Sequence, residues 1–195
     1  PDLQWEKTQQ VDVGIELGLF NGRLSFEADV YRKLTTDMLL SAPVPSSSGY
    51  STVTSNIGSM ENRGVEFALH TINVSTDDFT WSTDFNISVN KNEVIALTGG
   101  ADIFSGSSII REGEPVGSFF GFVHQGTWGT DEVDEATRYL KRPGDIKYQD
   151  VNNDGQINDS DRVIIGNGIP DGFGSLINTV NYKNFALTLD LQFMY

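Results

Sequence analysis

The segment that decides the fold is Val11-Asp12-Val13-Gly14-Ile15-Glu16-Leu17-Gly18-Leu19, in which every second residue is aliphatic. Successive side chains of a β-strand point to opposite faces, so this pattern predicts a strand with one apolar and one polar face. Asn21-Gly22 follows, and this dipeptide favours a type I′ turn because both positions need positive φ. Residues 24–30 then resume the alternation. The segment of about residues 9–38 is therefore predicted to be a β-hairpin.

The same rhythm predicts two further hairpins, at about residues 63–91 and 173–195. Long connections are expected at about residues 39–62 and 92–172, with a short strand near 116–123 and a helical turn or two near 131–140. Short turns at one end of long strands and long loops at the other are typical of outer-membrane barrels. We therefore predict an all-β chain that forms part of a transmembrane antiparallel β-barrel, with about six long strands in three hairpins and long extracellular loops. Because such barrels have at least about eight strands, the chain is expected to be a segment of a larger barrel.

The competing hypothesis is a soluble all-β module that binds calcium or carbohydrate, built as a β-sandwich. The two hypotheses differ in where they place seven aliphatic residues. The barrel exposes these residues to lipid, whereas the sandwich buries them beneath a second sheet. They are Val11, Val13, Ile15, Leu17, Leu187, Leu189 and Leu191.

Composition narrows the range of functions. Thirteen basic and 27 acidic residues give a net charge of −14, which argues against a nucleic-acid partner because phosphate binding needs a basic surface. The absence of cysteine excludes disulfides and thiolate catalysis. No apolar run approaches the length of a transmembrane helix. No arrangement of nucleophile and base stands out, and no pair of carboxylates is fixed as a glycosidase requires, so we do not expect an enzyme.

One acidic segment, residues 150–161, has the spacing of a calcium-binding loop. Oxygen-bearing side chains recur at the positions that such loops use, and Gly155 stands where the loop must turn sharply. The candidate calcium ligands are Asp150, Asn152, Asp154, Gln156, Asn158 and Asp161. The alternative is an acidic loop that satisfies its own backbone through side-chain hydrogen bonds.

In a barrel, the polar face of the strands lines the lumen, and aromatic residues form girdles at the membrane interfaces. The lumen face is expected to carry Asp12, Glu16, Glu27, Asp29, Glu66, Asp84 and His70. The girdle near the tight turns is expected to hold Phe20, Tyr31, Phe79, Trp81, Tyr182 and Phe185. Four aromatics of the long connection could stack on sugar rings or pack within the loop, and packing is favoured; they are Phe119, Phe120, Phe122 and Trp128. His124 is expected to be a polar group rather than a ligand.

A series of short motifs gives the chain a family resemblance. These are residues 5–8 (WEKT), 13–16 (VGIE), 29–33 (DVYRK) with Thr36-Asp37, 56–66 (NIGSMENRGVE), 90–94 (NKNEV), 113–121 (GEPVGSFFG), 143–148 (PGDIKY), 161–167 (DRVIIGN) and 182–185 (YKNF). Together, and in this order, they resemble the C-terminal barrel portion of a SusC/RagA-type TonB-linked outer-membrane receptor.

The resemblance implies a barrel of about 22 strands with a plugged lumen, located in the outer membrane. It further implies energisation by TonB, import of glycans or peptides, and a SusD-like surface lipoprotein as partner. The plug and the TonB box would lie outside these residues, so transport is not expected of them alone.

Overall fold

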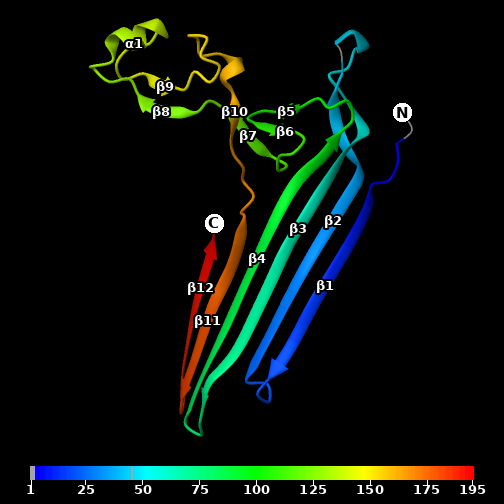
Figure 1. Cartoon of the computed structure of the whole chain (residues 1–195), viewed down its shortest axis with the longest axis vertical. Coiled ribbons are helices and arrows are strands. Elements are labelled where there is room, and N and C mark those ends of the chain that lie inside the picture. The colour runs from blue at the N-terminus through cyan, green and yellow to red at the C-terminus, as the bar shows by residue number, and fades with distance from the viewer. Residues whose placement is uncertain (1–2, 45) are drawn as a thin grey trace. The chain divides into compact units, whose positions relative to one another are not determined.

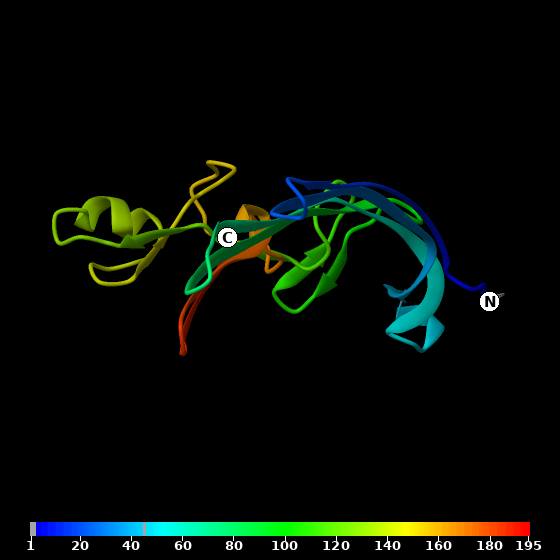
Figure 2. The same cartoon turned by 90° about the horizontal axis from the view of Figure 1, so that it is seen from below.

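Six long strands form one antiparallel sheet in the computed structural model, which describes residues 3–44 and 46–195. The strands lie in the order β1-β2-β3-β4-β11-β12 (Figure 1). Their bounds are β1 Lys7–Leu19, β2 Leu24–Pro43, β3 Thr52–Ser75, β4 Phe79–Leu97, β11 Gly172–Tyr182 and β12 Phe185–Met194. The sheet is curved across its width (Figure 2), and over the described residues β1 and β12 remain its two open edges. It is therefore a length of barrel wall rather than a closed barrel.

The three predicted hairpins are confirmed as β1–β2, β3–β4 and β11–β12. In the first turn Asn21 and Gly22 have φ of 57° and 81°, and the N–H of Arg23 donates to the carbonyl of Phe20 at 3.3 Å. In the third, Lys183 takes the positive φ of 52°. All three tight turns lie at the same end of the sheet (Figure 1).

The strands are longer than the sequence analysis predicted, and the prediction of a loop over residues 39–62 is wrong in extent. β2 continues to Pro43 and β3 already begins at Thr52, so only the short segment between them, with a 3-10 turn at Ser46–Ser48, connects the strands. β4 likewise runs to Leu97 rather than ending near residue 91. The extension of β3, residues 52–62, is rich in serine, threonine and asparagine and lacks apolar alternation, but it pairs with its neighbours all the same.

The chain divides into two compact units, and the second consists of residues 102–111 and 116–168. It holds a four-stranded sheet, β10-β7-β6-β5, and a two-stranded sheet, β8-β9. Its elements are β5 Ile103–Ser105, β6 Ser108–Ile110, β7 Ser118–Gly121, β8 His124–Thr127, α1 Val133–Arg138, β9 Ile146–Tyr148, a 3-10 turn at Asp159–Asp161 and β10 Val163–Gly166. β7 and α1 confirm the strand and the helical turn expected there. No helix in residues 3–44 and 46–195 is long and apolar enough to cross a membrane.

Very little of the large sheet is buried. Its buried hydrophobic residues are Val94 and Leu97, near the end of β4. There the segment 112–115 crosses the strand: the N–H of Gly113 donates to the carbonyl of Val94 at 2.8 Å, and Glu112 accepts from the N–H of Leu97 at 2.7 Å. Over the rest of the described sheet no second protein layer covers the aliphatic side chains.

Candidate functional site: two faces of one sheet

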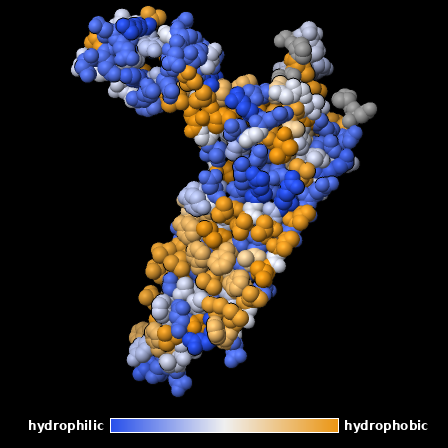
Figure 3. Space-filling model, viewed as in Figure 1, coloured by the Kyte–Doolittle hydropathy of each residue, from blue (hydrophilic) through white to orange (hydrophobic). Residues whose placement is uncertain are grey.

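The face that carries the alternating aliphatic side chains is exposed. Strand register aligns Val13, Val30, Val65 and Val89 in one row across β1 to β4, which we call the valine row. Hydrophobic residues cover much of the sheet between this level and the tight turns (Figure 3). The seven residues that separate the two hypotheses are 41–69% exposed; they are Val11, Val13, Ile15, Leu17, Leu187, Leu189 and Leu191. A sandwich would bury them, so the soluble-module hypothesis does not fit this sheet.

Aromatic rings run across the same face from strand to strand. Phe26 of β2, Phe67 of β3, Phe85 of β4 and Phe193 of β12 follow one another with centroid separations of 6.3, 6.2 and 6.4 Å. Such distances are within the range of favourable ring contacts. The rings therefore make the centre of this face a continuous apolar surface.

The height of the apolar band matches a bilayer. From Phe79 to Val89, β4 advances ten residues, or about 34 Å at about 3.4 Å per residue. Tilted by about 40°, as barrel strands are, this length projects to about 26 Å, close to the roughly 25 Å of an outer-membrane barrel's apolar band. The tight turns lie at one boundary of the band and the valine row at the other.

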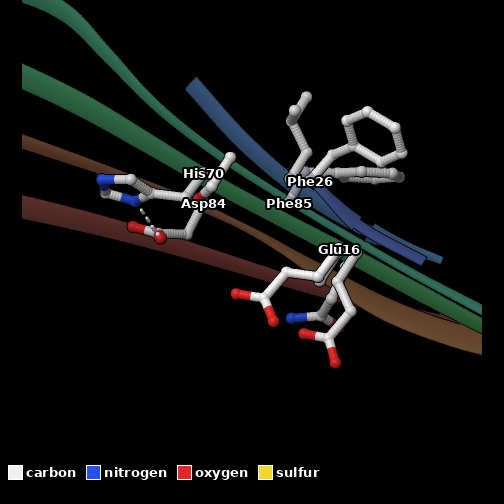
Figure 4. Close-up of a pocket in the computed structure, with 10 residues that line it drawn as sticks. Glu16, Phe26, His70, Asp84 and Phe85 are labelled. Carbon is white, nitrogen blue, oxygen red and sulfur yellow. Dashed lines mark hydrogen bonds and ion pairs between the residues drawn. The ribbon is translucent and has the colours of Figure 1, made fainter. Parts of the chain in front are cut away.

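The opposite face of the sheet is polar and mostly acidic. Register places the predicted lumen residues on it: Asp12, Glu16, Glu27, Asp29, Glu66, His70 and Asp84. Figure 4 shows Glu16, His70 and Asp84 on one side of the strands and Phe26 and Phe85 on the other. His70 Nδ1 and Asp84 Oδ1 are joined by a hydrogen bond of 2.6 Å, beside a shallow hollow that Glu16 also lines. A wall with lipid on one side and water on the other requires this division of side chains.

Tyr31 was assigned to the girdle near the tight turns, and the structure corrects this. It lies on the polar face beside the valine row's level, because its register partners are Asp12 and Gly64. Its hydroxyl donates to Asn90 Oδ1 at 3.0 Å. The ring passes over Gly64, where a Cβ would lie 2.6 Å from the hydroxyl oxygen. Alternation alone could have placed this residue, since 31 has the parity of the polar positions on β2.

The other aromatics of the predicted girdle do lie near the tight turns. Phe20, Tyr182 and Phe185 are 75%, 52% and 78% exposed, and Trp81 is 38% exposed. The indole N–H of Trp81 donates to Asn178 Oδ1 at 3.0 Å, so its polar edge is satisfied while the ring remains at the surface. Amphipathic rings at this level suit a membrane interface.

The acidic segment of residues 150–161 folds into a loop that binds its own backbone. Asp150 accepts hydrogen bonds from the N–H groups of Asp154 at 3.2 Å and Gly155 at 2.8 Å. Asn152 also accepts from Asp154, at 2.9 Å, and Asp154 in turn accepts from Gln156 at 2.8 Å. The predicted calcium ligands thus lie on one loop, with several of their oxygens directed inward.

Asp161 closes this loop. It is fully buried, and its two oxygens accept hydrogen bonds from Val151 N–H at 2.9 Å and Asn158 N–H at 2.8 Å. The hydrogen bond from the Asn158 N–H lowers the pKa of the Asp161 carboxyl most, and the hydrogen bond from the Val151 N–H lowers it further. In the described part of the chain, no three histidine, aspartate or glutamate side chains are grouped so as to hold a metal ion. Calcium binding by this loop stays a prediction.

Trp128 of the second unit packs against protein neighbours. Trp128 is 4% exposed, with Lys147 Nζ 4.3 Å from its ring centroid and Tyr139 stacked at 5.8 Å. Lys147 also donates to Glu132 at 2.6 Å. The N–H of Gly129 and then Lys147 lower the pKa of Glu132, and Glu132 raises the pKa of Lys147.

Phe120 and Phe122 pack in the same manner. Phe120 contacts Phe104 at 5.4 Å and Phe122 contacts Tyr148 at 5.3 Å, while Phe119 is 42% exposed. His124 lies edge-on to Tyr148 at 6.5 Å. Apart from Phe119, therefore, these rings are engaged with protein neighbours.

Sequence reasoning missed one group on the apolar face. Arg32, Arg63 and Lys91 lie side by side in the row after the valine row, and we call them the basic row. The signal was present in the sequence, because each cation lies two residues from the valine of its strand in the valine row: Arg32 after Val30, Arg63 before Val65 and Lys91 after Val89. It was overlooked because each charge also ends an apolar run, where a change to polar residues is expected anyway.

An antiparallel sheet with one exposed apolar face of bilayer height, one acidic face and tight turns at one end defines a segment of a membrane β-barrel wall. The TonB dependent receptor-like β-barrel family model matches residues 1–192, and the chain belongs to this family. The segment is thus part of the β-barrel of an outer-membrane receptor, as the sequence analysis predicted.

Similar proteins agree with this assignment. The chain is 38% identical to TonB-dependent receptor P3 of Formosa agariphila, over 98% of its own length and 20% of the relative's. It is 31% identical to TonB-dependent receptor SusC of Bacteroides thetaiotaomicron, over 98% and 19%. The solved structure of the RagAB peptide transporter superposes with a TM-score of 0.79 at 27% identity, over 100% of this chain and 22% of that one. The chain therefore spans about a fifth of the length of the curated relatives it matches.

Proposed function

We propose that the protein containing this segment is a TonB-energised outer-membrane importer of glycans or peptides that acts with a SusD-like surface lipoprotein. The observation that carries the proposal is the two-faced sheet: an exposed apolar band on one face and Asp12, Glu27, Glu66 and their acidic neighbours on the other. In this arrangement the segment supplies wall, with a hydrated surface turned to the lumen.

The choice of cargo and partner is supported by likeness to named proteins. One similar solved structure is described as a peptide transporter, RagAB, and one curated relative is SusC. The described lumen face carries a shallow open hollow lined by Glu16, His70 and Asp84, and the proposal assigns no cargo selectivity to it.

Uptake in whole cells tests the proposal. Cells with and without the gene are given labelled oligopeptides and, separately, labelled oligosaccharides, each with and without a protonophore that collapses the energy source for TonB. We expect one cargo class to accumulate only in the energised cells that carry the gene. Equal accumulation with and without the gene, for both classes, contradicts importer function. Normal uptake in cells that lack the proposed SusD-like lipoprotein contradicts only the partnership.

We further propose that the loop of residues 150–161 binds calcium and becomes more rigid when it does. Six oxygen-bearing side chains at calcium-loop spacing support this proposal. The expected role of calcium is structural, because the ion would hold the loop's oxygen-bearing side chains together.

A further inference from the structure

The basic row occupies a defined depth on the lipid-facing side of the sheet. Register joins Arg32 to Arg63 and Arg63 to Lys91, so one line of cations crosses β2, β3 and β4. The described strands keep unbroken register from the valine row to the basic row, which fixes both rows on the same face. The basic row is therefore the first polar row beyond the apolar band, on the side away from the tight turns.

Two carboxylates, in the next row of the same face on the side away from the valine row, form ion pairs with the cations. Glu61, whose side chain is 8% exposed, contacts Arg32 at 2.6 Å and Arg63 at 3.7 Å. Glu93, 28% exposed, contacts Lys91 at 3.1 Å and Arg63 at 3.7 Å. The three cations are 53–65% exposed. Three positive and two negative charges leave a net charge of +1 here, with the positive groups outermost, in a chain whose net charge is −14.

The exposed groups retain the chemistry to bind an anion. Both ion-pair contacts of Arg63 are 3.7 Å, longer than a hydrogen bond, so its guanidinium keeps donor capacity. Neighbouring strands lie about 4.8 Å apart, which puts the three cations within about 10 Å along one line. Guanidinium and ammonium groups at this spacing suit the oxygens of a phosphate group.

We propose that the basic row binds the anionic phosphate headgroup of an outer-leaflet lipid, whose acyl chains lie along the valine row and the phenylalanine rings below it. Charge complementarity selects the headgroup, and the apolar rows directly beneath select a lipid over a free anion. Basic side chains at the edge of a membrane span recognise anionic headgroups in this way. The binding is independent of import, because the basic row lies on the face opposite the lumen.

Native mass spectrometry of the full-length protein in non-ionic detergent tests the proposal. The protein is titrated with phosphatidylglycerol and with phosphatidylcholine of the same acyl chains, whose quaternary ammonium neutralises the phosphate. We expect phosphatidylglycerol to bind preferentially. In Lys91→Gln its binding should weaken about five-fold, the equivalent of about 1 kcal/mol for one basic residue near an anionic surface.

Lys33→Gln is the matched control, because Lys33 is exposed on the adjacent position of β2 but points to the polar face. It removes the same charge at nearly the same depth and should leave binding unchanged. Lys91→Arg should retain binding, and circular dichroism verifies that each variant is folded. Equal binding of the two lipids, equal losses in Lys91→Gln and Lys33→Gln, or displacement by an equal concentration of inorganic phosphate would each overturn the proposal.

Discussion

The lipid-facing assignment predicts that arginine is tolerated at one residue of β12 and not at the next. Leu189 lies on the apolar face and is 53% exposed, whereas Thr188 lies on the polar face. Both belong to the same strand at nearly the same depth. Leu189→Arg places a charge in hydrocarbon, while Thr188→Arg places it in the aqueous lumen.

The size of the effect follows from depth. Leu189 is four residues from Phe185, which stands at the turn, so it lies about 14 Å along the strand at about 3.4 Å per residue. With a tilt of about 40° this is about 10 Å above the girdle, near the middle of the band, where arginine costs about 2–4 kcal/mol. Leu187, at half that height, should cost less, and Thr188→Arg should cost under about 1 kcal/mol.

The measurement is guanidinium unfolding of the full-length protein folded into phosphatidylcholine vesicles, followed by tryptophan fluorescence. The expected order of destabilisation is Leu189→Arg, then Leu187→Arg, then Thr188→Arg. If Thr188→Arg destabilised as much as Leu189→Arg, the two faces would not be in different solvents, and the reasoning from register would be refuted.

Three further results are expected. Gly64→Ala should destabilise the same protein by about 1–3 kcal/mol, as overpacking does, because its Cβ would lie 2.5 Å from the backbone carbonyl of Val89 and 2.6 Å from the Tyr31 hydroxyl. Gly18→Ala has no atom within 4 Å of its Cβ and should change the unfolding free energy little; equal effects of the two substitutions would contradict this. Hydrogen exchange should show the loop held by Asp161 protected at neutral pH. Since its folded pKa is lowered, this stabilisation is complete above the ordinary aspartate pKa of about 3.9 and disappears as pH falls through the folded pKa; unchanged protection at pH 2 would argue against the role of the carboxylate. Isothermal titration should detect calcium binding that Asp154→Ala abolishes, and identical heats for the two proteins would reject the site.

The alternation in residues 11–19, repeated in the other two hairpins, was sufficient to predict the two faces of the main sheet, because a period of two has only two possible phases. In either case all the aliphatic residues lie on one face of the sheet. Alternation alone does not decide whether lipid or a second protein layer covers that face. The Asn21-Gly22 turn fixed the register of the first hairpin, and hairpin register then extends across β1 and β2. Alternation and this register were enough to place the carboxylates of β1 and β2 on the lumen face.

The parts that sequence could not predict have other causes. The portion of β3 from Thr52 lies beyond the membrane band, where nothing requires apolar alternation, so its polar residues resembled a loop. β5 and β6 have three residues each, too few to display a period. The spacing of the acidic segment correctly indicated one tight loop, but it gave no sign that Asp161 would be buried with both oxygens occupied.

The positions of the irregularities support the membrane assignment independently of hydrophobicity. β2 pairs with β3 without a shift from Leu24 to Thr35, and β3 pairs with β4 without a shift from Met60 to Ile72. Over these described strands, register shifts occur only outside those stretches, including a bulge just past Thr35 where Asp37 has a φ of 57°. A bulge leaves a residue unpaired, and an unsatisfied backbone group costs several kcal/mol in hydrocarbon but little in water. The ladder is therefore unbroken through most of the apolar band, where no water is available to satisfy the backbone: one shift lies opposite Trp81, near the tight turns and their membrane interface, and the others lie beyond the basic row.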